Sequence, residues 1–325
     1  MPKVSVVTPT YNMAHYLPQA LDSALGQDYP DMEIIVLDDG STDNTAEVIE
    51  RYEGRVRYVP VQHIGLACAY NRLTALSTGD YIQVLDADDA LLPGALSRSV
   101  AALEKYPSAG FAYAAATVID QDGRPYGRRL APEWIARAGL ATSKEAFRAL
   151  LSGCHVTHST AMIRRSVLED VGPYQAESVP GEDWDMWLRI VSRYDMFYVS
   201  ETGALYRTHP ASITSSYRCD DVYRSHRYTI ERIFADPKFR YASMRGYAFA
   251  CLHRTVATVA ARGRNRRAFV SHFSSAVRHR PGILGERATG TAVLEGAKTL
   301  FPRQVLAAGK SVRNALASTG SGAHA

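Results

Sequence analysis

Three carboxylates stand within four residues at Asp86, Asp88 and Asp89, and they are the most informative group in the sequence. They follow Tyr81–Leu85, an apolar run that is typical of a strand. Like charges packed so closely repel one another, so a fold tolerates them where a cation or strong hydrogen-bond donors compensate. Carboxylate oxygens suit a hard divalent cation such as Mg²⁺ or Mn²⁺. Taken alone, the segment is equally typical of an acidic turn that caps a helix.

Two further polar segments also directly follow strand-like runs. Thr8–Asn12 ends a β-branched run, and Asp38–Asp43 follows Glu33–Leu37. In an open α/β sheet ligands bind beyond the carboxyl ends of parallel strands, so we expect all three polar segments along one sheet edge. There Tyr11 can stack on a base, and Asp39 can accept a hydrogen bond from the imide N–H of uracil or thymine. This predicts a nucleoside-diphosphate site without a glycine-rich phosphate loop, although each segment alone is ordinary turn chemistry.

Strands and helices alternate through the first third of the chain. Periodicity predicts strands at 4–8, 33–37, 56–61 and 81–85, and helices at 14–25, 42–52 and 65–77. This order predicts an α/β fold with a mostly parallel sheet covered on both faces. Beyond residue 107 we expect strands at 111–119, 160–163, 196–199 and 204–208, and helices at 143–151, 166–171 and 182–193. Helix formers and Arg dominate after residue 222, which predicts a basic, mainly helical C-terminal region at 217–325 with a flexible tail.

Four segments together resemble glycosyltransferase family 2. Their order and spacing match the family in SVVTPTYN from Ser5, EIIVLDDGSTD from Glu33, GLACAYN from Gly65 and DADD from Asp86. The resemblance implies a GT-A fold, a Rossmann-like and mostly parallel mixed sheet, over residues 1–216. It places a nucleotide-sugar-binding half at 1–106 and an acceptor-binding half at 107–216. It also implies inverting transfer from a nucleoside-diphosphate sugar with Mg²⁺ or Mn²⁺.

The resemblance also implies roles for single residues at the donor site. The expected nucleotide-binding residues, for a UDP- or dTDP-sugar, are Pro9, Tyr11, Asp39 and Asp86, and the expected metal ligands are Asp88, Asp89 and His209. Tyr206–His209 resembles the family's late Arg-x-His element, although a purely structural histidine is the alternative for His209. Cys68 and Tyr70 depart from the family pattern, in which small or basic residues are more usual.

A later segment, GEDWDMWLR from Gly181, resembles the family's acidic-Asp-Trp element and implies that Asp183 is the catalytic base. Such a base takes the proton of the acceptor hydroxyl while that oxygen attacks the anomeric carbon opposite the departing diphosphate. Helix N-terminal capping is the alternative for Asp183, and Asp185 should point elsewhere on the helix. The residues expected near the acceptor or the diphosphate are Glu182, Trp184, Arg207 and His158, with core packing as the alternative for Trp184.

The net charge of +4 over 325 residues conceals an asymmetry. Residues 218–325 contain 19 Lys and Arg against 6 Asp and Glu, so they carry +13 while the rest carries −9. Four arginines between Arg262 and Arg267 stand beside Phe269, Val270 and Phe273, which predicts peripheral contact with the inner membrane face near a lipid-linked saccharide acceptor. Helices that only pack on the transferase domain are the alternative. Nucleic acid is disfavoured because aromatic residues are not interleaved with the basic ones.

Other features favour a cytoplasmic protein. No apolar run approaches the roughly 18 residues of a membrane span, the N-terminus has no signal-peptide pattern, and the four cysteines form no CxxC pair. We therefore predict a glycosyltransferase that uses a nucleotide sugar and an acceptor hydroxyl of a glycan or glycolipid. A non-catalytic module on the same fold, binding a sugar nucleotide or glycan, is the alternative, and the presence of Asp88 and Asp183 argues against it. A glycosidase would also use paired carboxylates but would need no diphosphate site.

Overall fold

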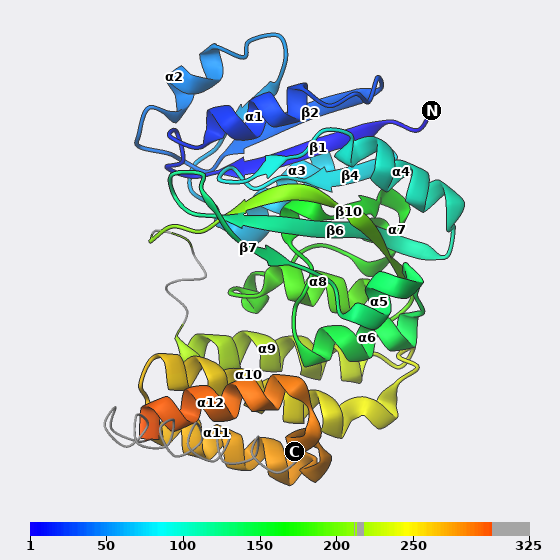
Figure 1. The fold of residues 1–325 in the computed structure, drawn as a ribbon. Coiled ribbons are helices and arrows are strands. Elements are labelled where there is room, and N and C mark those ends of the chain that lie inside the picture. Colours follow the sequence, from blue (N-terminus) through cyan, green and yellow to red (C-terminus); the bar gives the residue numbers. More distant parts are fainter. Residues whose placement is uncertain (211, 213–217, 301–325) are drawn as a thin grey trace, which may run out of the picture. The chain divides into compact units, whose positions relative to one another are not determined.

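The structure is a computed structural model, and it describes residues 1–210, 212 and 218–300 (Figure 1). Over these residues the chain forms two compact units. One covers residues 1–210, 212 and 231–241, and the other covers residues 218–230 and 242–300. The candidate site lies in the first unit.

A mixed sheet in the order β3-β2-β1-β4-β9-β6-β10-β5 forms the centre of the first unit. Its strands are β1 (Val4–Thr10), β2 (Met32–Asp38), β3 (Arg57–Pro60), β4 (Tyr81–Val84), β5 (Ala90–Leu91), β6 (Ala109–Ile119), β9 (Met162–Arg164) and β10 (Asp195–Arg207). Two short strands, β7 (Pro125–Arg129) and β8 (Leu140–Ala141), pair with β6 and β10. Strands β1 to β4 are parallel, and β9 runs antiparallel between β4 and β6. The predicted mostly parallel α/β class is therefore confirmed.

Helices flank this sheet (Figure 1). They are α1 (Leu17–Leu25), α2 (Thr45–Glu50), α3 (Leu66–Leu76), α4 (Ala95–Lys105), α5 (Glu133–Ala138), α6 (Ser143–Ser152), α7 (Arg165–Val171) and α8 (Glu182–Val191). Helix α1 forms because its apolar residues recur at helical spacing, and Leu17, Ala20, Leu21 and Ala24 are all buried. On another part of the sheet, Trp187 of α8 stacks on Phe111 of β6 with ring centroids 4.8 Å apart.

Two elements differ from the sequence expectation. The strands expected at 196–199 and 204–208 are one strand, β10, whose register against β6 shifts between Val199 and Ala204. Gly203 permits this close approach, since a Cβ there would lie 2.8 Å from Ala114 Cβ. The helix expected at 42–52 is limited to α2, because the Asp43 carboxylate accepts hydrogen bonds from Thr45 N and from the loop at Ala14 N.

The segment Glu231–Tyr241, which the sequence analysis placed in the C-terminal region, packs within the first unit. The Phe147 ring of α6 lies 5.1 Å from the Phe239 ring and 6.3 Å from the Phe234 ring. Arg193 adds an ion pair with Asp236 at 3.2 Å. Aromatic contacts therefore hold this segment against α6.

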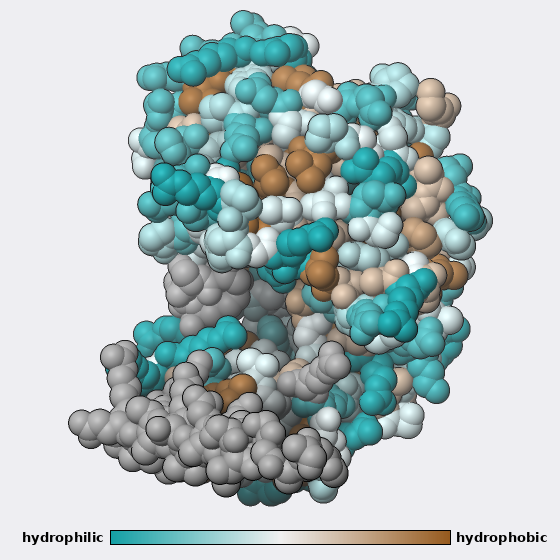
Figure 2. Space-filling model, viewed as in Figure 1, coloured by the Kyte–Doolittle hydropathy of each residue, from teal (hydrophilic) through white to brown (hydrophobic). Residues whose placement is uncertain are grey.

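The second unit is helical. It contains part of α9 (Cys219–Ala235), together with α10 (Arg245–Arg262), α11 (Arg266–His279) and α12 (Arg287–Leu300). Asn265 caps α11 by accepting a hydrogen bond from Ala268 N at 3.0 Å, and Phe269 packs with Ala257, Ala260 and Ala261 of α10. Among the described residues, no helix combines the length and the apolar character that crossing a bilayer requires. On the face shown in Figure 2, hydrophobic residues form small separate areas between hydrophilic ones.

Candidate active site

The carboxyl ends of β1, β2 and β4 lie next to one another, as the register of the sheet requires. Hydrogen bonds fasten the loops after β1 and β2 together. Asn12 N donates to Ser41 Oγ at 2.9 Å, and Thr42 N donates to Asn12 Oδ1 at 2.8 Å. In front of this junction Pro9 is buried in β1, whereas the Tyr11 side chain is exposed at 44%. Tyr11 thus presents a ring on which a flat ligand could stack.

Asp39 is buried next to Tyr11 and organises the start of α3. Its Oδ1 accepts from Ile64 N at 2.6 Å, and its Oδ2 accepts from Gly65 N at 3.0 Å. The His63 imidazole lies 3.0 Å from the same Oδ2, and its ring packs 4.7 Å from the Tyr11 ring. Each carboxylate oxygen has two lone pairs, so Oδ1 retains acceptor capacity for a ligand. His63 and Tyr11 together therefore flank the carboxylate expected to contact the base.

Asp86 begins the acidic loop after β4 and has a neutral hydrogen-bond donor as its closest side-chain partner. The Tyr70 hydroxyl of α3 donates to Asp86 Oδ1 at 2.5 Å. The Asp86 backbone N–H donates to Ser159 Oγ at 3.1 Å. His158 Nδ1 lies 3.9 Å from the same carboxylate oxygen. Asp86 forms no ion pair with Lys or Arg within the described part of the chain.

Asp88 faces His209, although 121 residues separate them in the sequence. His209 Nε2 lies 3.0 Å from Asp88 Oδ2, and the histidine ring packs 5.0 Å from the Tyr16 ring. Burial, together with the nearby Asp86 charge, raises the pKa of Asp88, and the His209 hydrogen bond opposes this shift. A cation at this point would stabilise the ionised carboxylate.

The Asp89 carboxylate and the Arg207 guanidinium both form hydrogen bonds to other groups of the protein. Asp89 Oδ1 accepts from Arg207 N at 2.8 Å, and Asp89 Oδ2 accepts from Ser159 Oγ at 2.6 Å. The Arg207 guanidinium donates to the Asp88 carbonyl at 2.9 Å, to the carbonyls of Asp120 and Gln121, and to the Gln19 side chain. These contacts favour a role in shaping the acidic loop for both residues over direct ligand binding.

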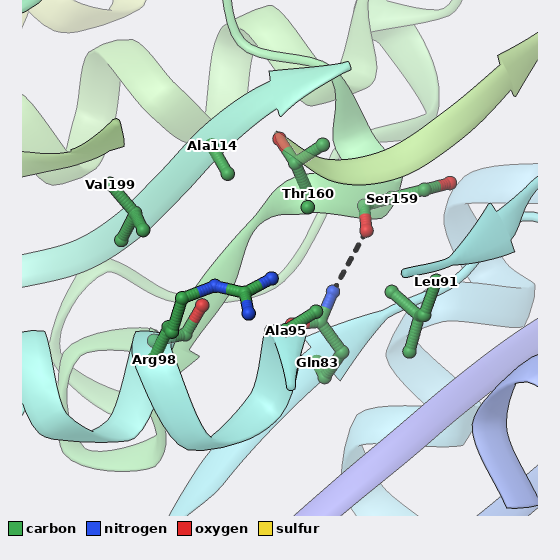
Figure 3. A pocket seen from close by; sticks show the side chains of 10 residues that line it. Gln83, Leu91, Ala95, Arg98, Ala114, Ser159, Thr160 and Val199 are labelled. Carbon is green, nitrogen blue, oxygen red and sulfur yellow. Dashed lines mark hydrogen bonds between the residues drawn. The ribbon is translucent and has the colours of Figure 1, made fainter. Parts of the chain in front are cut away.

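Ser159 connects the acidic loop to the sheet. Its carbonyl accepts a hydrogen bond from Gln83 Nε2 at 3.0 Å (Figure 3). A cavity behind it, lined in part by Gln83, Arg98 and Thr160, has room for about one water molecule. The Arg98 guanidinium beside it donates to the Pro93 and Thr202 carbonyls. This cavity is therefore far too small for a nucleotide.

Asp183 is the one residue of α8 that is not buried. The structure gives its carboxylate a hydrogen bond from Trp184 N at 2.6 Å. By contrast, Asp185 is fully buried and pairs with Arg189 at 2.8 Å, so it points into the interior as helical geometry predicts. Trp184 is also buried, and its indole N–H donates to the Leu150 carbonyl at 2.8 Å. Asp183 is thus the acid of this helix that a substrate can reach.

Glu182 and His158, both expected near the acceptor or the diphosphate, are buried. Burial, the Asp183 charge and the Asp86 charge raise the pKa of Glu182 to about 7. His158 is buried, with its ring 4.7 Å from Tyr70 and 5.5 Å from Trp187. Glu182 is therefore influenced electrostatically by both Asp183, the expected base, and Asp86, an expected donor-binding residue.

No three His, Cys, Asp or Glu side chains approach one another closely enough to hold a metal ion by themselves in the described chain. Asp88 and His209 nevertheless offer an oxygen and a nitrogen ligand side by side. Mg²⁺ and related ions commonly take one or two protein carboxylates and complete their coordination with substrate phosphates and water. The residues present therefore fit an ion that binds together with a diphosphate.

Sequence reasoning did not identify Tyr70, His63 or Ser159 as parts of the site. Tyr70 could have been noticed because it departs from the basic or small residues usual at this position in the family. Its partner Asp86 could not be inferred, because the two residues are 16 positions apart in the sequence. Cys68, the other departure, is exposed. The contacts of Ser159 and His63 depend on loops meeting across the sheet edge, which local sequence patterns do not encode.

Comparison with known proteins identifies the fold and the family. Residues 5–172 match Glycosyl transferase family 2. A putative teichuronic acid biosynthesis glycosyltransferase, TuaG of Bacillus subtilis, is 29% identical over 222 residues, which is 66% of this chain and 82% of that protein. Chondroitin synthase of Pasteurella multocida is 37% identical over 126 residues, which is 38% of this chain but only 13% of that protein.

Solved structures share the fold at low sequence identity. S. aureus TarS 1–349 in complex with UDP-GlcNAc has a TM-score of 0.60 and 17% identity, covering 86% of this chain and 92% of that one. The mannosyltransferase PcManGT of Pyrobaculum calidifontis, in complex with GDP-Man and Mn²⁺, has a TM-score of 0.57 and 18% identity, covering 93% and 88%. The GT-A-like arrangement expected from the sequence is thereby confirmed. With the family match spanning more than half of its residues, the chain belongs to glycosyltransferase family 2, whose members transfer a sugar from a nucleotide sugar.

Proposed function

We propose that this protein is an inverting glycosyltransferase that moves a sugar from a UDP- or dTDP-sugar to a hydroxyl of a glycan or glycolipid. The observation that carries the proposal is the position of Asp183, the one residue of α8 left accessible. Its charge and that of Asp86 both raise the pKa of the buried Glu182, which supports placing the base near the donor site. The relative TuaG of Bacillus subtilis, which is described as a putative teichuronic acid biosynthesis glycosyltransferase, supports a role in making cell-envelope polysaccharide.

The donor nucleotide would bind against the loops after β1 and β2. Tyr11 would stack on the base, Pro9 would shape the floor beneath it, and Asp39 would accept from the imide N–H. A pyrimidine has this N–H only in uracil and thymine, whereas cytosine lacks it. Asp86 would accept a hydrogen bond from a ribose hydroxyl through the oxygen that Tyr70 does not use. These contacts would select UDP or dTDP over CDP.

A divalent cation would be held by Asp88 with His209, and Asp89 would support the loop from below. When bound, such an ion neutralises charge that develops on the leaving diphosphate. His209 contributes a nitrogen ligand, which favours Mn²⁺ over Mg²⁺. The Arg207 guanidinium is engaged by four protein oxygens, so it would position Asp88 rather than contact phosphate.

Asp183 would accept the proton of the acceptor hydroxyl. As that proton moves to the carboxylate, the acceptor oxygen forms its bond to the anomeric carbon, and the bond from that carbon to the diphosphate oxygen breaks. Because attack and departure occur on opposite sides in one step, the anomeric configuration inverts. General base catalysis contributes about 10²–10⁴ in rate. Glu182, Trp184 and His158 would line this side of the site as packing groups rather than reacting ones.

The first test is calorimetric titration with UDP, dTDP, GDP and CMP, each with Mn²⁺ and with a chelator. We expect Mn²⁺-dependent binding of UDP or dTDP alone. Tight GDP binding would refute the assigned role of Asp39 while leaving a transferase, as the GDP-Man complex of PcManGT illustrates. Asp183→Asn should then retain nucleotide binding yet lose about 10²-fold or more of transfer. Full transfer by this variant would refute the base assignment.

We also propose that the turn between α10 and α11 contacts an anionic membrane surface near a lipid-linked acceptor. Arg262, Arg264, Arg266 and Arg267 are all exposed there, and Val270 on the next turn of α11 is exposed as well. Basic residues near anionic lipid each contribute about 1 kcal/mol.

Co-sedimentation with phosphatidylglycerol vesicles tests this membrane contact. Changing Arg264, Arg266 and Arg267 to Glu should abolish binding. A charge-matched control that changes the exposed Arg51, Arg55 and Lys144 of the first unit to Glu should leave binding intact. Equal loss in both variants, or binding to neutral phosphatidylcholine vesicles, would refute this contact.

A further inference from the structure

Tyr70 of α3 donates a hydrogen bond to Asp86, a residue of the proposed donor site, and brings no positive charge to it. Its side chain is buried, and its hydroxyl donates to Asp86 Oδ1 at 2.5 Å. O–H···O⁻ contacts of this length are the strong, charge-assisted kind. Burial and the Asp86 charge raise the pKa of Tyr70 well above its ordinary value, so the hydroxyl keeps its proton. Asp86 thus gains a fixed partner but no counter-charge.

The Tyr70 ring is itself held in place from two sides. It stacks on the Tyr174 ring with centroids 5.0 Å apart and packs 4.7 Å from the His158 ring. The neighbouring Asn71 pins the backbone of Tyr174, accepting from its N–H at 2.7 Å and donating to its carbonyl at 2.9 Å. The Tyr174 hydroxyl lies 3.2 Å from His158 Nε2. Rotation of Tyr70 away from Asp86 would disrupt this whole arrangement.

A carboxylate has two oxygens that interchange when the side chain rotates. In Asp86 the short bond to Tyr70 fixes one oxygen, which leaves the other oriented for a ligand. A basic side chain at position 70 would fix the orientation too, but it would also neutralise Asp86. Neutralising Asp86 would weaken the attraction of the acidic loop for a cation, because charges only a few ångströms apart interact strongly.

We propose that Tyr70 is a positioning residue that orients Asp86 for the donor and preserves the negative charge of the acidic loop. The inference rests on the proposed function, since it assumes that Asp86 contacts a nucleotide. Tyr70 makes no contact with the reacting atoms in this scheme and acts entirely through Asp86. It also links the donor loop to the segment around Tyr174 that precedes α8.

The test is UDP binding in the presence of Mn²⁺, measured by calorimetry on the full chain. Tyr70→Phe keeps the ring and its stacking but removes the donor to a charged acceptor, so UDP affinity should fall about tenfold or more. Tyr113→Phe is the matched control, because it removes a buried hydroxyl that has no hydrogen-bond partner among the described residues. This control should leave UDP affinity unchanged.

A double-mutant cycle with Asp86→Ala separates positioning from general loosening of the fold. If Tyr70 acts through Asp86, Tyr70→Phe should cause no further loss of UDP affinity once Asp86 is truncated. Unchanged affinity of the single Tyr70→Phe variant, or an equal loss in the Asp86→Ala background, would overturn the inference while leaving the proposed function standing. Failure of the wild-type protein to bind any nucleotide would overturn both.

Discussion

Asp183 and Asp185 carry the same functional group two residues apart on α8, and the structure predicts opposite consequences for the same substitution. Asp185 has no exposed surface and pairs with Arg189 at 2.8 Å. Arg189 is also buried and donates to the carbonyls of Val171, Gly172 and Pro173. Asp185→Asn keeps the shape of the side chain but leaves the guanidinium charge without its counter-ion in the interior.

The expected cost follows from this burial. Removing one partner of a buried ion pair costs about 3–5 kcal/mol. Asparagine still offers an oxygen to Arg189, so we expect the lower end for Asp185→Asn, about 3 kcal/mol, or roughly a 150-fold change in the unfolding equilibrium. Asp183 is partly exposed and loses only a favourable charge near a helix N-terminus, so Asp183→Asn should cost less than about 1 kcal/mol.

Urea denaturation followed by tryptophan fluorescence is the suitable assay. All three tryptophans, Trp134, Trp184 and Trp187, lie in the first unit, so the signal reports the unit that contains α8. The unfolding midpoint should fall markedly for Asp185→Asn and barely for Asp183→Asn, which should instead lose transfer activity. Equal midpoints for the two variants, or a large loss of stability in Asp183→Asn, would refute the assignment of one structural and one reactive acid.

Three further predictions concern stability. Gly296→Ala in α12 should destabilise the helical unit by about 1–3 kcal/mol, because the added Cβ would lie 2.0 Å from the Phe269 ring. Gly290→Ala in the same helix is the control, because its Cβ would meet open space, and it should be neutral or slightly stabilising. Thermal denaturation followed by circular dichroism measures both. Burial and the Asp183 charge raise the pKa of Glu182 to about 7, so the protein takes up a proton on folding, and the stability of the wild type should fall as pH rises from about 4.5 to 7. The urea midpoints of Glu182→Gln should depend less on pH than those of the wild type. Parallel pH profiles for the two proteins would contradict this. Burial and the neighbouring His272 lower the pKa of His253 to about 4, so its contribution to the free energy of unfolding is present at neutral pH and lost as pH falls from about 6.5 to 4. In His253→Gln the helical circular dichroism signal should be less sensitive to acid. An unchanged acid transition would count against this prediction.

Much of the sheet could be predicted because its strands are defined locally. β1, β2 and β4 are mostly apolar runs, each followed by a polar loop, and the helices between them have an apolar stripe. β10 was predicted as two strands because polar residues and Gly203 interrupt its pattern. The chain continues the strand through this interruption, since pairing with the long β6 extends on both sides of it. Tertiary pairing therefore overrode the local signal.

The site divides differently. The family resemblance suggested Asp86, Asp88 and Asp183 from motifs alone, and helical geometry predicted that Asp185 points elsewhere than Asp183, which its burial bears out. The partners of these acids could not be predicted in the same way. Asp89 meets Arg207 across 118 residues, and the Tyr70 contact to Asp86 depends on how α3 packs beside the loop after β4.

The number of protein partners distinguishes the acids that can act from those that support them. Asp89 and Asp185 are buried with protein donors on their carboxylates, and a carboxylate satisfied in this way gains little from a ligand. Asp88 and Asp183 each have a single side-chain hydrogen bond among the described contacts, and both are partly accessible. Because desolvating a charge without partners is costly, the fold keeps such acids where a cation or a substrate can complete their coordination. The negative charge of Asp88 and of Asp183 should therefore matter more for binding a cation or a substrate than the charge of any other acid of this site.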